Sequence, residues 1–431
     1  MPPRVYWAHF DPEACWHDCN SLSLPAPLGA KSALHLALLD DMFVPADAQD
    51  LSLTIVPKCQ ALHDYHVSIG GNYHTQSVFE SVEAWVSEDM PSWPEIFASI
   101  QSDAGTPYLE VRDTLSSCAQ IPYAYLAQAP VSHFQSPPRL DAIRYANSKS
   151  TITQLCQQLE IPCVGKVIEH QDEITQLLKL DCPYVLKEAF GVSGKGAYLV
   201  KEQRIAERLV RHFQKQSAQG KQGGVIAQPW LDIEIDFSSQ WEISACGEIT
   251  FIGLCRVENK AFRFNGIDLC CQSLSEAVSH SNYYEQIQLL LSELFKVGYF
   301  GSVCVDSALL KNGTVYPVIE VNARESMGSI ALRWQNKLSI GNSIRLRQYD
   351  VTYQAPVNFE SILHKLALQG ALFCHGKLGG IIPIAAASFG LPQQNNLVKG
   401  RWVHLECGSQ TSESYRAILQ SCLSDVGVSL L

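Results

Sequence analysis

A short apolar run near the middle of the chain carries three polar side chains at alternate positions, in Val318-Ile319-Glu320-Val321-Asn322-Ala323-Arg324. Side chains two residues apart on a strand share one face, so a carboxylate, an amide and a guanidinium are expected to project together. Asp306 ends the preceding run, Ser302-Val303-Cys304-Val305-Asp306, and supplies a second acid. Such oxygen ligands suit Mg²⁺, which completes its shell with water and nucleotide phosphates. The alternative is a solvated hairpin face, which the valines and isoleucines on both strands disfavour.

The two runs are joined by Lys311-Asn312-Gly313-Thr314, and Asn-Gly between apolar runs is a strong hairpin signal. A two-residue turn at Asn312-Gly313 would place Asp306 and Glu320 on opposite faces of the hairpin. Convergence of the two acids therefore needs a shifted register. The sequence predicts either a three-residue turn with Gly313 or Thr314 left-handed, or a bulge near Pro317, which cannot donate to a central ladder.

A glycine-rich segment upstream, from Pro183 to Val200, is typical of strand, loop and strand. Lys187 ends the first strand, where an unpaired ammonium would be costly to bury, so we expect it to meet an anion such as a nucleotide phosphate. Gly191, Gly194 and Gly196 allow the backbone to approach phosphate oxygens closely. Lys195 is followed by glycine, which excludes a Walker A loop. A hairpin loop without a ligand stays open as the alternative.

Between these clusters, an apolar strand that begins near Gly224 stops at Pro229 and resumes with alternating acids up to Asp236. The break leaves backbone N–H and C=O groups that could meet an adenine edge, and Glu234 could take ribose hydroxyls. Taken alone, acids that alternate with isoleucine more often form the solvent face of a strand.

Lys149 lies at the start of a predicted helix, Ser148 to Leu159, with Ile152, Leu155 and Leu159 at helical spacing. A cation at a helix N-terminus is repelled by the helix dipole. An anion bound between the free backbone N–H groups and Lys149 would make this interaction favourable. We therefore favour phosphate binding over a solvated lysine.

Taken in this order, these segments resemble the ATP-grasp superfamily of ATP-dependent ligases, over roughly residues 141 to 335. The resemblance implies an α/β (α+β) fold with three parts. We expect an N-terminal α/β pre-grasp domain in residues 1–140, a two-subdomain ATP-grasp domain in residues 141–350, and a C-terminal α/β segment in residues 351–431 that completes or caps the core.

The resemblance also assigns roles by position. Asp306, Glu320 and Asn322 match the metal ligands, while Arg324 matches an arginine that steadies the acyl phosphate or its tetrahedral successor. Lys187 and Arg256 complete the expected catalytic group with Arg324. The residues expected to bind ATP are Lys149, Lys187, Ser193, Gly194, Gly196, Gln228, Trp230, Leu231 and Glu234.

Three features depart from the family pattern. Gln228 stands where the hinge commonly opens with an acid, so its amide oxygen would accept from the adenine amino group. Cys304 replaces an arginine found in some amino-acid ligases two residues before the metal acid, which argues against a close match to the D-alanine ligases. The segment from Glu325 to Ser329 matches no subfamily of known substrate.

A basic stretch from Leu254 to Gly266 follows a predicted strand, Ile249 to Gly253. We expect a cationic loop here, in which Arg256 could hold the γ-phosphate or an acceptor carboxylate, while Lys260 is better read as solvated.

Composition narrows the class of protein. The chain of 431 residues has a formal net charge of −11, which argues against nucleic acid as a partner. There is no signal-peptide pattern and no apolar run of about 18 residues, so we expect a cytoplasmic protein without membrane contact. The 15 cysteines are odd in number and scattered, as expected for reduced core residues.

The resemblance to ATP-grasp ligases implies an enzyme that uses ATP and Mg²⁺, with Mn²⁺ as a possible substitute, to activate a carboxylate as an acyl phosphate. An amine or thiol would then displace phosphate and form a C–N or C–S bond. The expected partners are small carboxylate and amine substrates, and a carrier protein and a homodimer stay open. A carboxyphosphate-forming enzyme and an ATP-binding regulator are the alternatives.

Overall fold

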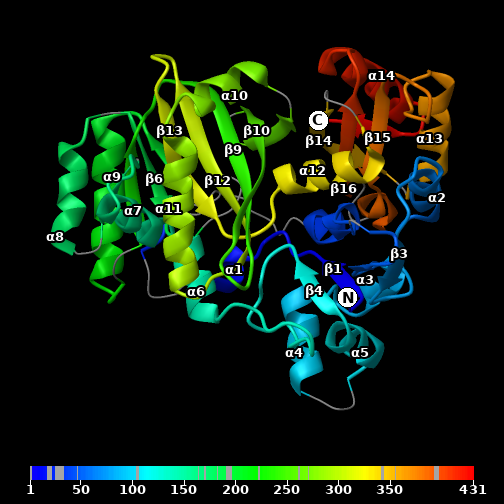
Figure 1. The fold of residues 1–431 in the computed structure, drawn as a ribbon, viewed down its shortest axis with the longest axis horizontal. Coiled ribbons are helices and arrows are strands. Elements are labelled where there is room, and N and C mark those ends of the chain that lie inside the picture. The colour runs from blue at the N-terminus through cyan, green and yellow to red at the C-terminus, as the bar shows by residue number, and fades with distance from the viewer. Residues whose placement is uncertain are drawn as a thin grey trace.

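The computed structural model describes residues 2–16, 22–24, 34–45, 47–102, 106–163, 165–168, 171–181, 183–190, 197–221, 224–260, 263–269, 271–340, 344–354, 356–392 and 398–431. The strands in these residues form three sheets, which Figure 1 shows as an N-terminal α/β unit, a small sheet with its helices, and a large sheet between and beside them. No helix in the described ranges is long and apolar enough to cross a membrane.

The N-terminal unit is built on four parallel strands in the order β3-β2-β1-β4. Their bounds are β1 (Arg4–Trp7), β2 (Leu51–Thr54), β3 (His74–Ser77) and β4 (Ala119–Pro122). The accompanying helices are α1 (Glu13–Trp16), the 3-10 helix η1 (Leu34–Met42), α2 (Gln60–Ser68), α3 (Val82–Ser87), α4 (Trp93–Ser102) and α5 (Leu109–Ser117). The parallel sheet confirms the α/β prediction for this region.

The helix that precedes β2 is a 3-10 helix, η1, and not an α-helix. Asp40 and Asp41 at the end of η1 are buried and accept hydrogen bonds from backbone N–H groups of other segments, Ile55 for Asp40 and Ala386 for Asp41. These long-range bonds decide the local geometry in place of helix propensity.

The small sheet is antiparallel and has the order β5-β8-β6-β7. Its strands are β5 (Lys166–Ile168), β6 (Tyr184–Glu188), β7 (Ala197–Val200) and β8 (Val225–Pro229). The helices beside it are α6 (Leu140–Asn147), α7 (Lys149–Gln158), α8 (Gln171–Ile174), η2 (Thr175–Lys179) and α9 (Gln203–Ser217). α9 buries Ala206, Leu209, Val210 and Phe213, the one-sided spacing of a helix that covers a sheet.

The large sheet has nine strands, and all its paired strands are antiparallel. The path runs β13-β12-β9-β10-β11-β14-β16-β15, and β17 pairs with β14. The bounds are β9 (Ile233–Ile243), β10 (Ile249–Lys260), β11 (Arg263–Asp268), β12 (Gly301–Leu310), β13 (Val315–Asn322), β14 (Ile344–Tyr353), β15 (Gly380–Ala385), β16 (Val398–Cys407) and β17 (Val428–Leu430). Its helices are α10 (Gln272–Ser279), α11 (Tyr283–Lys296), α12 (Met327–Leu338), α13 (Phe359–Leu368), η3 (Ala387–Gly390) and α14 (Ser412–Ser424).

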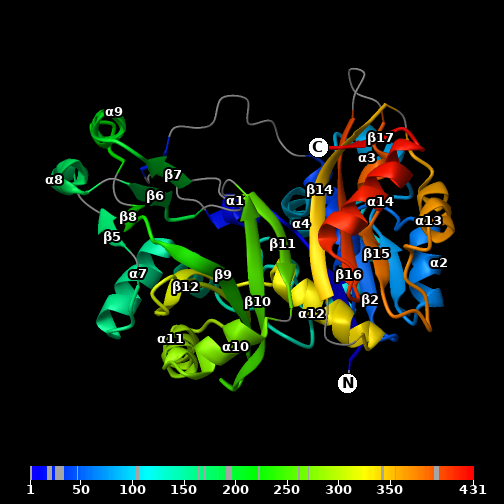
Figure 2. The same ribbon diagram turned by 90° about the horizontal axis from the view of Figure 1, so that it is seen from above.

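The C-terminal strands join the large sheet and do not form a sheet of their own, as Figure 2 shows from above. The expected domain boundary at residue 350 falls inside β14. This strand pairs with β11 on one side and with β16 on the other, so it joins the two parts of the sheet. The C-terminal segment therefore continues the central sheet.

The basic stretch from Leu254 to Gly266 was expected to be a loop and is instead part of a hairpin. β10 extends to Lys260, and β11 pairs back against it from Arg263 to Asp268. The alternation of Cys255, Val257 and Asn259 with charged residues is the period-2 signal that should have indicated a strand.

A short N-terminal segment, residues 22–24, lies against the small sheet. Leu22 and Leu24 belong to its apolar core, and the Leu24 N–H donates to Glu188 Oε1 at 2.6 Å. Gln216 on α9 holds Ser23 through both its amide oxygen and its amide nitrogen. The N-terminal unit thus reaches across to the small sheet.

Candidate functional site

The hairpin of β12 and β13 places Asp306 directly opposite Glu320, and Cys304 opposite Asn322. Nearer the turn, Ala308 pairs with Tyr316, so the register shifts between these two points. One residue of β12 faces three residues of β13 across the shift, and the Ser307 hydroxyl donates to the Pro317 carbonyl oxygen at 2.8 Å. A bulge therefore brings the two acids face to face.

The turn itself also differs from a two-residue hairpin. The Leu310 N–H donates to the Thr314 carbonyl oxygen at 2.9 Å, and Gly313 has φ +82°. This is the three-residue turn with left-handed Gly313 that the sequence predicts. The three-residue turn and the bulge were predicted as alternatives, and the structure contains both. The turn places Asp306 and Glu320 on the same face of the hairpin, and the bulge puts them directly opposite each other.

Two lysines from the small sheet and its neighbouring helix converge on Glu320. Lys149 Nζ lies 3.1 Å from Glu320 Oε1, and Lys187 Nζ lies 3.7 Å from Glu320 Oε2. All three side chains are mostly buried, with exposed fractions of 10%, 16% and 18% for Lys149, Lys187 and Glu320. Ser148 caps α7 by accepting from the Thr151 N–H, which fixes Lys149 at the first helical position.

The charges of this group shift each other's protonation. Burial would raise the pKa of Glu320, but Lys149 and Lys187 outweigh it and hold this pKa below its usual value. Burial, and then repulsion by Glu320, raise the pKa of Asp306 to about 7. Glu320 therefore keeps its negative charge, and this charge makes the charged form of Asp306 less stable.

The donor set fits a divalent cation. Asp306, Glu320 and Asn322 share one face of the hairpin, and Asn322 Nδ2 donates to Asp306 Oδ2 at 2.9 Å. In the described ranges, no group of three or more His, Cys, Asp or Glu side chains could hold a metal by itself. Two carboxylates and an amide oxygen suit Mg²⁺, which usually keeps waters and takes phosphate oxygens.

Arg324 lies at the end of this group. Its Nη2 donates to Asn322 Oδ1 at 3.1 Å, and its Nη1 donates to the Tyr123 hydroxyl oxygen at 3.3 Å. The guanidinium therefore connects the face that carries the candidate metal ligands to the carboxyl end of β4 in the N-terminal unit.

The hinge after β8 is partly committed to contacts within the protein. The Trp230 N–H donates to the Pro183 carbonyl oxygen at 3.2 Å, so this N–H is not the free donor that the proline break suggested. Gln228 is buried, and its Nε2 lies 3.5 Å from the Ile319 carbonyl oxygen. The Trp230 side chain is 49% exposed and Leu231 is half-buried, while Glu234 is exposed.

Arg256 does not join this site, and three other predicted residues cannot be placed. Arg256 pairs in register with Phe237, and Phe237 with Ser307, so Arg256 projects from the face of the sheet opposite to Asp306. Ser193, Gly194 and Gly196 lie outside the described residues.

Asp236 belongs to the site and was not singled out from the sequence. It lies opposite Ala308, on the same face as Asp306, and Asn259 donates to its Oδ2 at 3.3 Å. Burial raises the pKa of Asp236, and the nearby Lys187 opposes this. Its position two residues after Glu234 on one strand was the available signal.

Cys304 lies beside the acids but is not suited to nucleophilic attack. Burial, and then the charge of Asp306, raise the pKa of its thiol well above the usual value. Its Sγ is contacted by Gln240 Nε2 at 3.5 Å. The structure therefore supports a packing role for Cys304.

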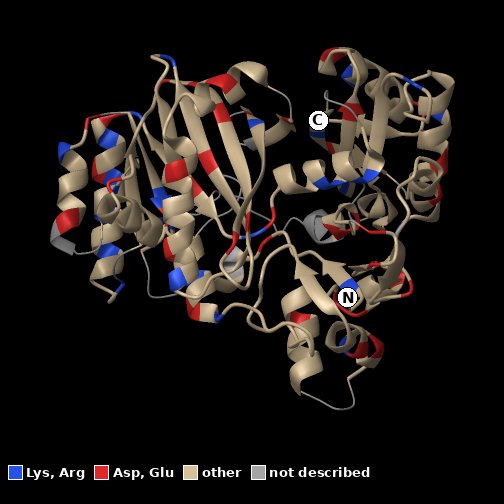
Figure 3. Cartoon of the chain, viewed as in Figure 1, with Lys and Arg blue, Asp and Glu red and all other residues tan. Residues whose placement is uncertain are grey.

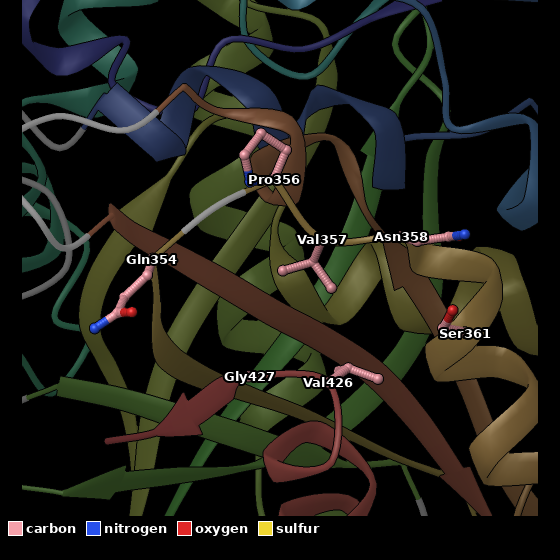
Figure 4. Close-up of a pocket in the computed structure, with 7 residues that line it drawn as sticks. All are labelled: Gln354, Pro356, Val357, Asn358, Ser361, Val426 and Gly427. Carbon is pink, nitrogen blue, oxygen red and sulfur yellow. The ribbon is translucent and has the colours of Figure 1, made fainter.

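Two cavities in the described part of the chain differ in their lining. The larger, about 430 Å³, lies in the C-terminal part and is drawn in Figure 4. None of the residues that line this larger cavity has an ionisable side chain. They are Gln354, Pro356, Val357, Asn358, Ser361, Val426 and Gly427. The smaller, about 150 Å³, includes among its lining residues Arg324, whose guanidinium also contacts Asn322. Figure 3 shows acidic and basic residues interspersed in both halves of the chain, without a continuous basic stripe in that view.

This arrangement defines a class of protein. A small antiparallel sheet faces the edge hairpin of a large one, lysines from the first meet acids from the second, and a parallel α/β unit precedes both. This is the ATP-grasp fold.

Similarity to solved structures over nearly the whole chain agrees with it. Biotin carboxylase from Campylobacter jejuni aligns with a TM-score of 0.54 at 11% identity, over 100% of this chain and 92% of that one. The biotin carboxylase domain of Hydrogenobacter thermophilus 2-oxoglutarate carboxylase aligns with a TM-score of 0.50 at 11% identity, over 100% and 91%. N5-carboxyaminoimidazole synthetase from Staphylococcus aureus aligns with a TM-score of 0.50 at 11% identity, over 97% and 96%.

Neither a family model nor a curated protein matches the sequence. The fold is therefore identified by structure, and the activity has to be argued from the residues of this chain.

Proposed function

We propose that this protein is an ATP-dependent ligase that activates a carboxylate as an acyl phosphate and transfers the acyl group to an amine. The observation that carries the proposal is the convergence of Lys149 and Lys187 on Glu320, directly opposite Asp306. Two ammonium groups beside a pair of buried acids form a site for a polyphosphate together with its metal ion. Structures that share the fold include complexes with ADP and with MgADP.

In this proposal, Lys149 and Lys187 bind phosphate oxygens of ATP. Gln228, Trp230 and Leu231 line the adenine end, where the exposed indole of Trp230 offers an apolar surface. Glu234 lies next along the strand and takes the ribose. Asp306, Glu320 and Asn322 would hold Mg²⁺, which supplies neutralisation of charge on the phosphate oxygens.

The reaction proceeds in two displacements. A carboxylate oxygen of the substrate attacks the γ-phosphorus, and the bond from that phosphorus to the β,γ-bridging oxygen breaks, so ADP leaves. The amine lone pair then attacks the acyl carbon, phosphate leaves, and the amine proton is released to solvent. Lys187 and Arg324 stabilise the negative charge that develops on the phosphoryl group and on the acyl oxygen.

A second candidate is formation of carboxyphosphate from bicarbonate. It is favoured by the similarity in fold to the Hydrogenobacter thermophilus domain, which is described as a complex with MgADP and bicarbonate. A thiol acceptor, for example on a carrier protein, would use the same acyl phosphate and end in a C–S bond.

Nucleotide analysis tests the proposal. The protein is incubated with Mg-ATP and a pool of amino acids, small carboxylic acids and amines, and the products are separated. ADP that forms only with the pool, and is lost in Glu320→Gln, supports the ligase. ADP formation stimulated by bicarbonate alone supports the second candidate, whereas AMP as the product contradicts acyl phosphate formation.

A further inference from the structure

The smaller cavity lies where the N-terminal unit meets the large sheet. Its wall includes the carboxyl end of β4 from Gln120 to Pro122, the following residues Tyr123 to Tyr125, the end of β9 at Glu242, and the start of β12 at Ser302. In the order β3-β2-β1-β4, β2 and β3 lie on one side of β1, and β4 lies on the other side. The strand order therefore reverses between β1 and β4. Ligands of open parallel sheets bind at the carboxyl ends of strands where the order reverses.

The cavity lies on the same face of the large sheet as the candidate metal ligands. Ser302 pairs with Glu242, Cys304 with Gln240 and Asp306 with Ser238, so these positions all share one face of the large sheet. Four residues of strand separate Ser302 from Asp306, which is about 13 Å. Arg324 lies between them, with one nitrogen on Asn322 Oδ1 and the other on the Tyr123 hydroxyl oxygen.

Two carboxylates, those of Glu242 and Glu325, line the cavity. The Ser302 hydroxyl oxygen lies 2.8 Å from Glu242 Oε2 and 3.2 Å from Glu325 Oε1, and its single proton can serve only one of them. Arg333 pairs with Glu325 through Oε1. Glu325 is 4% exposed, and its Oε2 is buried without a hydrogen-bond partner.

A buried carboxylate oxygen without a donor is unfavourable, so a further hydrogen-bond donor near Glu325 would be stabilising. An ammonium group would provide several donors and a compensating charge. Tyr125, Tyr299 and Phe300 line the same cavity and supply aromatic surface next to the acids. Aromatic rings favour cations and apolar side chains.

Arg324 also lines the cavity and adds positive charge there, while its guanidinium stays bonded to Asn322 and Tyr123. A carboxylate that approached Arg324 would be attracted by this charge. A molecule with both an ammonium group and a carboxylate would therefore match both kinds of charge in the lining. The volume of about 150 Å³ admits a small molecule of this kind.

We propose that this cavity binds a small amino acid as its zwitterion, with the ammonium group held by Glu242 and Glu325 and the carboxylate directed toward Arg324. The inference rests on the proposed function in one respect, because the carboxylate so placed is the one that ATP would activate. Binding of the amino acid itself is independent of turnover.

The test compares matched ligands on the full-length protein. Calorimetry measures binding of amino acids and of their counterparts that lack the amino group, such as alanine and propionate or valine and isovalerate, with a non-hydrolysable ATP analogue and Mg²⁺ present. At least one amino acid is expected to bind about tenfold or more tightly than its counterpart.

Glu242→Gln is expected to remove this preference, and it keeps the size of a side chain that already reaches solvent. Glu285→Gln, on the exposed side of α11, is the matched control and should change nothing. Equal affinity for amino acids and their counterparts, or a preference that survives Glu242→Gln in a protein that melts normally, would overturn the inference.

ADP assays on the same ligands separate the two proposals. ADP formation with carboxylic acids regardless of the amino group would leave the ligase standing and refute the amino-acid site. Amino-acid binding that depends on Glu242, without any ADP formation, would refute the ligase and leave the site.

Discussion

Lys149 Nζ lies 3.1 Å from Glu320 Oε1, although Lys149 begins a helix beside the small sheet and Glu320 lies on the edge strand of the large sheet. The contact therefore joins the two halves of the ATP-grasp fold through opposite charges. Lys149 also donates its backbone N–H to the Ala189 carbonyl oxygen at 3.0 Å, which ties the start of α7 to the end of β6. Any ligand that replaces Glu320 as the partner of Lys149 has to be an anion.

Glu320→Gln should abolish most of the activity without unfolding the protein. The amide keeps the shape of the side chain but loses the charge that pairs with two lysines and would bind the metal. We expect ADP formation to fall by about 100-fold or more, a loss of about 3 kcal/mol in transition-state stabilisation. Initial rates compared with Glu285→Gln measure this, and a rate within about twofold of wild type would refute the assignment.

Lys149→Met should weaken ATP binding more than it slows the chemical step. The side chain contributes a charge and a hydrogen-bond donor to phosphate in both the ground state and the transition state, so the KM for ATP should rise by about tenfold or more. Lys296→Met serves as the control, because Lys296 is 66% exposed and pairs only with Glu293 among the contacts described. An unchanged KM for ATP would mean that Lys149 has a structural role.

Gly313→Ala should lower stability and leave activity intact. Gly313 has φ +82°, which an L-residue adopts only at a cost of about 1 kcal/mol, although a Cβ there would meet no atom within 4 Å. Gly220→Ala, at φ +89° and equally open, should show a similar decrease in melting temperature. A large loss of ADP formation in Gly313→Ala at temperatures where it is folded would show that the turn does more than set the register.

Binding of an amino acid should weaken in acid through Glu242. Desolvation by the surrounding protein, and then repulsion from Glu325, raise the pKa of Glu242 to about 7. The hydrogen bond from Ser302 and the charge of Arg333 act in the opposite direction. Because the Glu242 side chain is exposed to water, the rise in its pKa is limited. The prediction therefore uses only the direction of this change in pKa. The charged form binds the ammonium group, and it is lost as pH falls through this pKa.

The arginines and tyrosines around Glu242 are not expected to reproduce this effect. Arg324 and Arg333 keep their charge, and burial raises the pKa of Tyr125 and Tyr299, which stay neutral. The dissociation constant of the amino acid should therefore rise from about pH 8 to about pH 6 in wild type. The same titration of Glu242→Gln should be flatter, and identical slopes in the two proteins would remove Glu242 from the site.

The sequence predicts the site where side-chain chemistry and strand period agree. Glu320, Asn322 and Asp306 converge because alternate positions of a hairpin share a face, and the parity argument required the irregular turn that Gly313 provides. The size of the bulge could not be predicted, since it depends on Ser307 bonding the Pro317 carbonyl across the hairpin.

Other features depend on tertiary packing that no local pattern contains. Arg256 was assigned by position in a presumed loop, whereas the pairing of β9 with β10 turns it to the other face. The bonds of η1 to distant backbone amides, and the junction that brings Glu242 to Tyr123, are contacts between separate parts of the chain. The sequence therefore identified individual chemical groups more reliably than the cavity they form.

Isotope transfer tests the central claim most directly. A substrate identified from the pool is labelled with ¹⁸O in its carboxylate and incubated with the protein, Mg-ATP and an amine acceptor. Formation and displacement of an acyl phosphate transfer one carboxylate oxygen to inorganic phosphate, so we predict ¹⁸O in the phosphate released together with ADP. Label in AMP, or phosphate without label despite product formation, would contradict the account.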